Sequence, residues 1–582
     1  MRKTKIVCTI GPACESEEML EKMILGGMNV ARMNFSHGTH EGHKEKIDRV
    51  KKLRKKLGVP VAILLDTKGP EIRTGKLENG KVELVKGNEI ILTTEEVLGN
   101  DKRISVSYSN LPRNLKKGNT LMLDDGLIEL VVKEVEGTEI TCSIISGETL
   151  KDKKSLNVPG IAIDMDFISE TDKSDILFGI ENDVDYIALS FVRTPQDIKD
   201  VRRLLQSNGS YNIELISKIE NTEGVKNIAE IIEVSDGIMI ARGDMGVEIP
   251  FEELPHIQKD IIERCYAIGK KVITATQMLE SMIKHPRPTR AEITDVANAI
   301  YDKTSAIMLS GETASGAYPL KALETMGKIA EKTESNISYK FFERRVTDLA
   351  EVSISYAISD ATCKAAQALG ASAIIAVTLS GQSARMIAKY RPETPIIAFT
   401  PREKTYNQLA LTWGVTPLMN EFIENSNELF SDVVSRVEER GFAKSGEIVV
   451  VAGSSHNAPG ATNTLQAFMV GNILLKGKGN DAESVRGRVY VIKDNERDLS
   501  NFKSGDILVV SRTTNDVLQL MRQCSGVITE ENENDSGIVS AGYALDLPVI
   551  AGAEGATSIL RTGANIRLDA KAGYVYNSGT AE

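Results

Sequence analysis

Short apolar runs alternate with amphipathic stretches along the first 340 residues of the chain. Eight of these runs have the length and β-branched content of buried strands. They fall at 5–10, 28–35, 61–67, 185–192, 214–220, 237–244, 271–277 and 306–312. Each is followed by a stretch with helical periodicity, for example 170–182, 195–206 and 253–268. Eight such βα units predict an α/β fold built on a (β/α)₈ TIM barrel.

The third βα unit is interrupted by a segment with a different pattern. Residues 70–167 contain short strands and turn sequences such as Asn79-Gly80 and Asp125-Gly126. This pattern predicts an inserted all-β lid domain. The barrel domain is therefore expected in two parts, 1–69 and 168–340.

The pattern changes again after the barrel. Residues 341–473 predict an open α/β domain, with helices at 353–369 and 383–391 and strands at 373–379, 395–400 and 447–453. A glycine-rich linker at 476–480 then leads into a small extra domain at 474–582, which contains the strand-like sequences DILVVS and LPVIAG.

Composition narrows the class of protein. A chain of 582 residues is too long for one core and is expected to form three or four domains. Its net charge of −11 gives no basic footprint for nucleic acid or an anionic membrane. No apolar run has the length of a signal peptide or a membrane span. The six cysteines are scattered without a C-x-x-C pair, so we expect packing residues and a cytoplasmic protein.

Polar residues gather where the predicted barrel strands end, which is where TIM barrels carry their active sites. Strand five ends with Lys218 and Glu220, strand six with Arg242, Gly243 and Asp244. The other strand ends contribute Arg32, Asn34 and Ser36, Asp66 and Thr67, Thr276, and Ser310 with Glu312. For Ser310 and Glu312, a structural cap at a helix start is at least as good an interpretation as a functional role.

Three buried charges at neighbouring strand ends indicate a metal site. Burying Lys218, Glu220 and Asp244 is costly unless other groups compensate their charge. Mg²⁺ or Mn²⁺ with an anionic substrate would do so, because both ions prefer oxygen ligands. Asn34, Ser36, Asp66 and Thr67 form a second oxygen-rich set that is better suited to a monovalent cation. The alternative that Asp66 caps a loop remains open.

Phosphoryl transfer is the chemistry that these residue types favour, because it needs positioning and charge neutralisation more than covalent catalysis. Arg32 and Arg73 can hold phosphate oxygens with two hydrogen bonds each. Lys218 can neutralise the negative charge of the phosphoryl group as that group passes from donor to acceptor. The chain contains neither a G-x-x-x-x-G-K-[ST] loop nor a protein-kinase signature, so those nucleotide-binding folds are excluded.

Long motifs, in order along residues 1 to about 470, resemble those of bacterial pyruvate kinases. They are TKIVCTIGPA (4–13), RMNFSHG (32–38), LLDTKGPEIRTG (64–75), ISKIEN (216–221), ARGDMGVEIP (241–250), ATQMLESM (275–282), RPTRAEITDVANA (287–299) and LSGETA (309–314). The resemblance implies transfer of the phosphoryl group of phosphoenolpyruvate to ADP, giving ATP and pyruvate. That reaction is the last step of glycolysis, and the resemblance implies a homotetramer under allosteric control.

The resemblance also implies residue roles. Arg32, Lys218 and Thr276 would be catalytic and would bind the substrate together with Gly243 and Asp244. Mg²⁺ or Mn²⁺ would lie on Glu220 and Asp244, and K⁺ on Asn34, Ser36, Asp66 and Thr67, with Glu71 in the version of its motif that goes with K⁺ dependence. Contacts to ADP and ATP would come from Arg73, His37, Lys154 and Asn34.

The later domains carry two further resemblances. Thr378, Ser380 and Ser383 are similar to the family's loop for the phosphate of an effector, a sugar phosphate or an AMP-like molecule, although a strand-to-helix turn explains them equally well. The second effector loop corresponds to 453–464. The tail resembles the mobile domain of phosphoenolpyruvate-utilising enzymes. It has Asp535-Ser536-Gly537 where that family has Thr-Ser-His, which predicts a structural or regulatory role.

Two rival functions remain. Another metal-dependent enolate enzyme, such as an aldolase or lyase, would explain Glu220 and Asp244 but neither the monovalent-cation set nor the lid. A non-catalytic regulator on the same fold would explain the architecture, but Lys218, Glu220, Asp244 and Thr276 are all intact.

Overall fold

A computed structural model of the chain describes residues 2–161, 163–338, 353–454, 462–471, 473–492, 501–532 and 537–577. It divides into two compact units. The first comprises Met1–Tyr356 and Val377–Phe422, and the second comprises Ala357–Ala376 and Ile423–Glu582.

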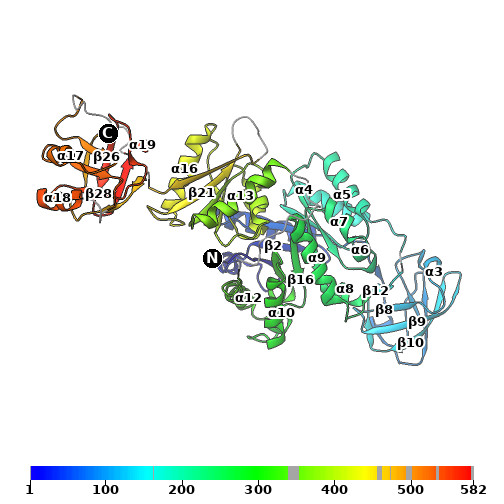
Figure 1. The fold of residues 1–582 in the computed structure, drawn as a ribbon. Coiled ribbons are helices and arrows are strands. Elements are labelled where there is room, and N and C mark those ends of the chain that lie inside the picture. The colour runs from blue at the N-terminus through cyan, green and yellow to red at the C-terminus, as the bar shows by residue number, and fades with distance from the viewer. Residues whose placement is uncertain are drawn as a thin grey trace. The chain divides into compact units, whose positions relative to one another are not determined.

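Eight parallel strands close into a barrel in the first unit (Figure 1). They are β1 (Lys5–Thr9), β2 (Val30–Asn34), β3 (Ala62–Asp66), β13 (Tyr186–Leu189), β14 (Glu214–Ile219), β15 (Gly237–Ala241), β16 (Lys271–Ala275) and β17 (Ala306–Leu309). The order around the barrel is β1-β17-β16-β15-β14-β13-β3-β2. All eight predicted strands are present, and the predicted TIM barrel is confirmed.

Helices follow the strands along the chain and flank the barrel (Figure 1). They are α1 (Glu17–Leu25), α2 (His40–Leu57), α4 (Glu170–Glu181), α5 (Pro195–Ser207), α6 (Thr222–Lys226), α7 (Ile228–Val234), α8 (Arg242–Glu248), α9 (Leu254–Ile268), α10 (Arg290–Tyr301), α11 (Gly311–Ala314) and α12 (Pro319–Glu334). Several of these helices start at a side-chain cap. Thr194 and Asp197 form a capping box at α5, and Thr289 and Glu292 form one at α10.

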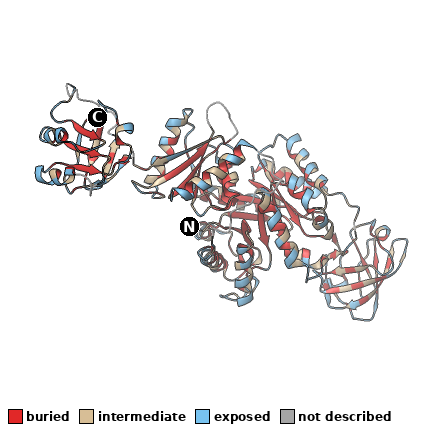
Figure 2. Cartoon of the chain, viewed as in Figure 1, coloured by how far each residue is buried: buried red, intermediate tan, exposed pale blue. Residues whose placement is uncertain are grey.

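The barrel strands are buried (Figure 2). Their side chains alternate between two faces and so build two cores. One core contains strand residues together with residues of the surrounding helices, so it lies between barrel and helices. The other fills the barrel interior and includes Val7, Val30, Leu64, Ala188, Ile216, Met239 and Ile273. Ala410 and Leu411, from the short helix η4 (Leu409–Leu411), belong to the same interior cluster.

Three predicted strands were three residues too long at their carboxyl ends. The predicted strand 185–192 ends at Leu189, 237–244 ends at Ala241 and 306–312 ends at Leu309. Residues 242–248 and 311–314 are helical instead. After Ala241 the buried apolar residues are Met245 and Ile249, and that spacing of four fits a helix rather than a strand. Arg242 and Asp244 therefore lie in the first turn of α8.

The lid segment forms its own sheet and core within the first unit. Its strands β4 (Ile72–Arg73), β6 (Glu89–Thr93), β7 (Arg103–Ser105), β8 (Thr120–Leu123), β9 (Ile128–Glu136), β10 (Glu139–Ser146) and β12 (Ser155–Asn157) pair in the order β4-β12-β8-β9-β10-β6-β7. β5 (Lys81–Glu83) pairs with β11 (Thr149–Lys151), and α3 spans Leu111–Asn114. Positive φ angles at Asn79, Gly80, Asp125 and Gly126 confirm both predicted turns.

The remaining elements belong to the two C-terminal domains. The first unit contains α14 (Gln382–Ala388), β19 (Ile396–Thr400), α15 (Glu403–Gln408) and β20 (Val415–Met419), with β19 and β20 parallel. α13 spans Ile354–Ala368. The second unit contains α16 (Ser426–Glu439), β21 (Ile448–Gly453) and β22 (Thr464–Met469), and β21 pairs with β18 (Ala373–Val377).

The tail forms an eight-stranded sheet in the second unit. Its order is β23-β30-β29-β25-β26-β27-β28-β24, and it includes the predicted strands as β26 (Ile507–Val510) and β28 (Val549–Ala551). The other strands are β23 (Ile473–Lys476), β24 (Lys478–Gly479), β25 (Val485–Ile492), β27 (Gly526–Thr529), β29 (Asn565–Asp569) and β30 (Tyr574–Asn577), with helices α17 (Asn515–Leu520), α18 (Gly537–Leu545) and α19 (Ala556–Ile559).

Candidate active site

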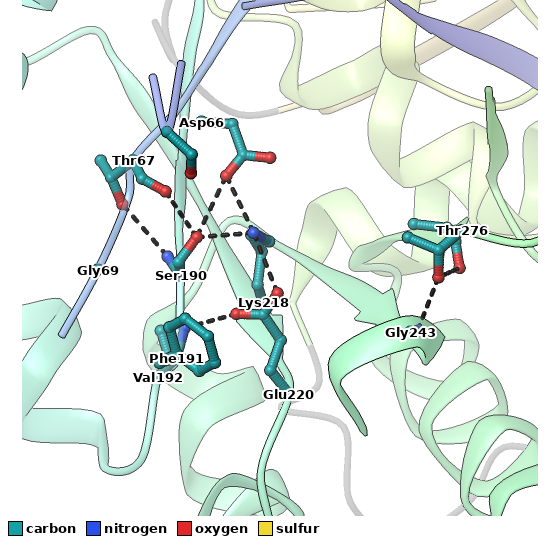
Figure 3. Close-up of polar contacts among 12 residues, drawn as sticks. Asp66, Thr67, Gly69, Ser190, Phe191, Val192, Lys218, Glu220, Gly243 and Thr276 are labelled. Carbon is teal, nitrogen blue, oxygen red and sulfur yellow. Dashed lines mark hydrogen bonds and ion pairs between the residues drawn. The ribbon is translucent and has the colours of Figure 1, made fainter. Parts of the chain in front are cut away.

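A polar layer covers the apolar interior of the barrel at the carboxyl ends of its strands. Thr9, Arg32, Asp66, Ser190 and Lys218 each follow a member of the interior cluster by two residues, so their side chains share its face. They are joined by short contacts, several of which are drawn in Figure 3. Arg32 Nε donates to Asp66 Oδ2 at 2.6 Å, and Arg32 Nη1 donates to Thr9 Oγ1 at 2.9 Å.

Lys218 lies at the centre of this layer (Figure 3). Its Nζ is 3.1 Å from Asp66 Oδ1 and 3.0 Å from Glu220 Oε1, and it donates a 2.6 Å hydrogen bond to Ser190 Oγ. Burial disfavours the ammonium ion, but Asp66 and Glu220 together raise the pKa of Lys218 above its usual range. The lysine is therefore a buried, permanently charged cation.

The charge of the Glu220 carboxylate is less well compensated than that of Asp66. Asp66 has both Arg32 and Lys218 beside it, and these outweigh burial and lower the pKa of Asp66. For Glu220, burial and repulsion from Asp244 and Asp66 outweigh Lys218 and raise its pKa to about 7. Its Oε2 accepts from the N–H of Phe191 at 2.7 Å, while the buried Oε1 has the ion pair with Lys218 as its one contact among the described residues. An additional cation at Oε1 would relieve this repulsion.

Asp244 and Glu220 are the candidate ligands for a divalent ion. The half-buried carboxylate of Asp244 makes no hydrogen bond or ion pair with the part of the chain that the structure describes. Asp66 and Glu220 oppose two cations, Arg32 and Lys218, so the carboxylate of Asp244 gives the site an excess negative charge. No set of three or more His, Cys, Asp and Glu side chains among the described residues could hold a metal. A two-carboxylate site of this kind fits Mg²⁺ or Mn²⁺ with substrate and water oxygens as further ligands.

Thr276 is held beside Gly243 in a strained backbone conformation. The N–H of Gly243 donates to Thr276 Oγ1 at 2.8 Å (Figure 3). Thr276 and Gln277 have φ angles of 64° and 54°, which are unfavourable for residues other than glycine and cost of order 1–3 kcal/mol each. Arg242 stabilises this turn through Nη2, which donates to the Thr276 carbonyl at 2.6 Å. Arg242 is therefore a structural support and does not belong to the charged layer.

The predicted K⁺ residues lie on two adjacent strand ends. Asn34 and Asp66 are register partners of β2 and β3, and Ser36 and Thr67 follow them. Asn34 Oδ1 accepts from the Ser36 N–H at 3.2 Å, and Thr67 Oγ1 accepts from the Ser190 N–H at 3.2 Å. These three oxygen-bearing side chains keep acceptor capacity for a weakly charged ion, whereas Asp66 is already paired with Arg32 and Lys218.

The predicted nucleotide contacts fall into two groups. Arg73 and Lys154 lie in the lid, where Arg73 pairs with Glu71 at 2.7 Å and Lys154 pairs with Asp124 at 2.6 Å. His37 is exposed and Asn34 is half-buried at the barrel. Among the described contacts, none joins the two groups.

Glu312 is structural, in agreement with the alternative interpretation given above. It is fully buried, and its two oxygens accept from the N–H groups of Leu279 at 3.1 Å and Ser310 at 2.7 Å.

Ser190 and Thr9 belong to the polar layer although neither was predicted as a site residue. Ser190 Oγ is 2.6 Å from the Thr67 carbonyl oxygen and 3.3 Å from Asp66 Oδ1, in addition to its contact with Lys218. A polar residue two positions after an apolar strand residue that faces the barrel interior is the signal that would have found both.

Replacing Ser190 with alanine (Ser190→Ala) is expected to lower kcat/KM about tenfold or more, because a hydrogen bond to a charged group contributes roughly 1.5–3 kcal/mol. Steady-state kinetics would measure this. Ser217→Ala is the matched control: Ser217 is also buried, lies next to Lys218 in β14, and bonds Ser235 at 2.6 Å instead. An equal loss in both variants would contradict a specific role for Ser190.

Glu248 is a half-buried carboxylate near the site. Its oxygens accept from Asn157 Nδ2 at 3.5 Å and the Thr222 N–H at 3.4 Å, which connects the last lid strand, the barrel and α8. Burial raises the pKa of Glu248 to about 7. It lines a cavity of about 220 Å³ together with Glu71, Phe191 and Arg193.

Glu248 should make the stability of the first unit depend on pH. Because its pKa is raised on folding, the folded state binds more protons between about pH 4.5 and 7, so stability falls as pH rises through this range, by up to about 3 kcal/mol. Glu248→Gln is expected to flatten that part of the profile, as thermal unfolding at several pH values would measure. The exposed Glu252→Gln is the control and should keep the wild-type slope; an unchanged slope in Glu248→Gln would refute the prediction.

The proposed effector loop has a structural role for at least one hydroxyl. Thr378 Oγ1 accepts from the Gly381 N–H at 3.0 Å and so closes the turn before α14. Ser380 is exposed and Ser383 is buried. Residues 455–461 of the second effector loop lie outside the described residues.

The tail position that corresponds to the phosphohistidine is Gly537, the first residue of α18; Asp535 and Ser536 lie outside the described residues. The preceding Glu530 accepts from the N–H and hydroxyl of Thr557 at 2.8 and 2.7 Å. Glu531 accepts from the N–H of Thr513 at 2.8 Å. Two carboxylates and no histidine at this place disfavour a phosphoryl group.

The helices among the described residues are all too short or too polar to cross a membrane.

Comparison with known families matches three parts of the chain. Residues 1–323 match the model of the pyruvate kinase barrel domain, residues 356–467 that of the pyruvate kinase alpha/beta domain, and residues 502–573 that of the mobile domain of PEP-utilising enzymes.

Whole proteins give the same result. A pyruvate kinase of Staphylococcus saprophyticus is 46% identical over 579 residues, and one of Bacillus licheniformis is 44% identical over 578 residues; each alignment covers 99% of both chains. Among solved structures, a pyruvate kinase from Cryptosporidium parvum is similar, with a TM-score of 0.77 and 39% identity over 80% of this chain and 96% of that chain.

Proposed function

The chain belongs to the pyruvate kinase family and is a phosphotransferase with that activity, and we propose that the polar layer of its barrel is the reacting site for phosphoenolpyruvate and ADP. The observation that carries the proposal is the incomplete charge balance of this layer. Asp66 and Glu220 pair with Arg32 and Lys218, whereas Asp244 has neither an ion pair nor a hydrogen bond among the described residues, so the layer carries one more negative than positive charge. Such a site favours a divalent cation that an anionic substrate can approach.

Lys218 and Arg32 are proposed to bind the phosphoryl group. Arg32 uses Nε and Nη1 for Asp66 and Thr9, so Nη2 can donate to a phosphate oxygen. Lys218 is held in place by three partners and can stabilise the negative charge of the phosphoryl oxygens during transfer. The bond between phosphorus and the enol oxygen breaks, and a bond to the terminal phosphate oxygen of ADP forms.

Thr276 and Gly243 are proposed to orient the remaining enolate. The strained turn presents the Thr276 hydroxyl next to the first turn of α8, beside Asp244. There it can bind the substrate carboxylate and take part in the proton path to the methylene carbon, which yields pyruvate.

Glu220 and Asp244 would hold Mg²⁺ or Mn²⁺, and Asn34, Ser36, Asp66 and Thr67 would hold K⁺. The family generally requires both ions. When bound, the divalent ion supplies charge neutralisation between the donor and acceptor oxygens.

Arg73, His37, Lys154 and Asn34 are proposed to contact ADP and ATP. Arg73 and Lys154 come from the lid, so nucleotide binding would draw on the domain proposed at residues 70–167. The other proposed boundaries are 1–69 and 168–340 for the barrel, 341–473 for the α/β domain and 474–582 for the extra domain. We further propose a cytoplasmic homotetramer that acts at the last step of glycolysis. A phosphorylated effector would bind at Thr378, Ser380 and Ser383.

The test is pyruvate formation from phosphoenolpyruvate and ADP, with Mg²⁺ and K⁺ omitted in turn. Strict dependence on ADP and the divalent ion and a marked loss without K⁺ are expected. Pyruvate formation without ADP would indicate the rival enolate chemistry, and undiminished rates without K⁺ would refute the monovalent site.

A further inference from the structure

The opposite end of the barrel interior is closed by a second polar cluster, which we call the floor cluster: Glu214, Lys271, Tyr186 and Arg385. Glu214, Lys271 and Tyr186 are the first residues of β14, β16 and β13. Glu214 Oε2 accepts from Lys271 Nζ at 2.5 Å, and Oε1 accepts from Arg385 Nη1 at 3.3 Å. Lys271 Nζ also lies 5.5 Å from the centre of the Tyr186 ring.

The carboxylate of the floor cluster is well compensated by its two cations. Burial raises the pKa of Glu214, but Lys271 and then Arg385 lower it further, so the net pKa is below the usual range. The side chain of Lys271 reaches Glu214 past β15, where the intervening residue is Gly237. A Cβ at Gly237 would lie 2.7 Å from Ile216 Cδ1 and 3.1 Å from Lys271 Cβ. Gly237 therefore leaves the space that the Lys271 side chain needs to reach Glu214, and a larger residue at position 237 would clash with Ile216 and Lys271.

The strands of the floor cluster are the strands of the reacting site. On β14, Glu214, Ile216 and Lys218 share the interior face, and Glu220 follows directly. On β16, Lys271 and Ile273 lead to Ala275 and then Thr276. On β13, Tyr186 and Ala188 lead to Ser190, which bonds Lys218. Between the two polar layers lie close-packed apolar side chains, which transmit displacement because they cannot be compressed.

Arg385 connects the floor cluster to the segment proposed to receive an effector. It lies in α14, and its Nη2 donates to the carbonyl of Ser380 at 3.0 Å. Gly381 is in the left-handed region, and a Cβ there would lie 2.7 Å from Arg385 Nη1. Tyr186 adds a second connection, since its hydroxyl donates to the Gln408 carbonyl at 2.6 Å.

We propose that the floor cluster is a positioning element for the reaction. Glu214 fixes the positions of β13, β14 and β16 relative to one another along the barrel axis, and these positions set the distances of Lys218 and Glu220 from Thr276. Because Arg385 also holds the 378–383 segment, these distances depend on the conformation of the segment. The inference rests on the proposed function for the identity of the reacting site. None of the four residues contacts that site, since Glu214 is about 13 Å from Lys218 along the strand.

The experiment measures Mn²⁺ affinity by titration, and KM for phosphoenolpyruvate, in full-length Glu214→Gln, Arg385→Gln and Arg385→Lys. Glu214→Gln is expected to shift both constants by roughly two- to thirtyfold, the range for residues that couple distant sites. Arg385→Gln should shift them in the same direction, and Arg385→Lys should restore most of the wild-type values. The double variant Glu214→Gln/Arg385→Gln should lose less than the sum of the two single variants, because both remove the same Glu214–Arg385 ion pair.

The control is Asp197→Asn, which removes the buried capping carboxylate of α5 outside the barrel interior. It should lower the melting temperature without changing Mn²⁺ affinity or KM. Wild-type Mn²⁺ affinity and KM in Glu214→Gln, whatever its melting temperature, would overturn the proposal. If Glu214→Gln does not fold, the part-exposed Arg385 decides: equal behaviour of its Gln and Lys variants would overturn the proposal. Mn²⁺ binding is measured without turnover, so it tests the floor cluster independently of catalysis. The proposed function would be refuted by a different result, namely a wild-type chain without pyruvate kinase activity.

Discussion

Replacing Lys218 with methionine (Lys218→Met) is expected to reduce kcat by about 10²–10³-fold or more, since it removes a preorganised cation from the reacting site. KM for phosphoenolpyruvate should change much less, because Arg32 and Asp244 remain. Lys218 is 8% exposed and is shared by Asp66 and Glu220, so its ammonium group cannot be replaced by a neighbouring lysine or by water. Steady-state kinetics at saturating Mg²⁺ would measure the effect.

The matched control is Lys5→Met. Lys5 is also a buried lysine of a barrel strand, but it lies at the opposite end of the barrel and donates to the Val415 carbonyl at 2.6 Å. Both variants lose a buried ammonium group, so both can lose stability, which thermal unfolding would record. The loss of kcat should be confined to Lys218→Met. A near-normal kcat in that variant would remove the role proposed for Lys218.

Glu220→Gln is expected to abolish the stabilisation of the protein by Mg²⁺ together with almost all of its activity. A ligand that binds only the folded state at 100 times its Kd raises the free energy of unfolding by about 2.7 kcal/mol. The wild type should therefore melt at a higher temperature with Mg²⁺ or Mn²⁺ than without. An amide in place of the Glu220 carboxylate removes one of the two charged ligands, so this increase should disappear.

Glu312→Gln is the comparison that separates metal binding from stability. Glu312 is also a fully buried glutamate at a strand end, but its oxygens bond the backbone N–H groups of Leu279 and Ser310. Its amide variant should melt at a lower temperature and still be stabilised by Mg²⁺. A normal Mg²⁺-dependent increase in Glu220→Gln would exclude Glu220 as a metal ligand.

The reacting site was predictable to the extent that it is encoded in strand ends. The alternation of side chains along a barrel strand identifies the residues that face the interior. The polar residue that follows the last apolar residue on that face lies at the reacting site. Arg32, Asp66, Lys218 and Glu220 were found in this way. Ser190 follows the same rule and was missed because Phe191 and Val192 come after it and extend the apolar run beyond the end of β13 at Leu189. Arg242 looked like a member of the site and is instead a support for the turn at Thr276.

The sequence by itself determined the eight strands, the order of the domains and the kind of charge at each strand end, because periodicity and motif are properties of neighbouring residues. Tertiary structure decided which charges share a partner. Closure of the barrel places β13 between β3 and β14, so Lys218 lies between Asp66 and Glu220 and takes Ser190 as a third partner. It also decided that Asp66 is neutralised while Glu220 is not. Electrostatic balance depends on distances between segments remote in the chain, and only the folded barrel sets those distances.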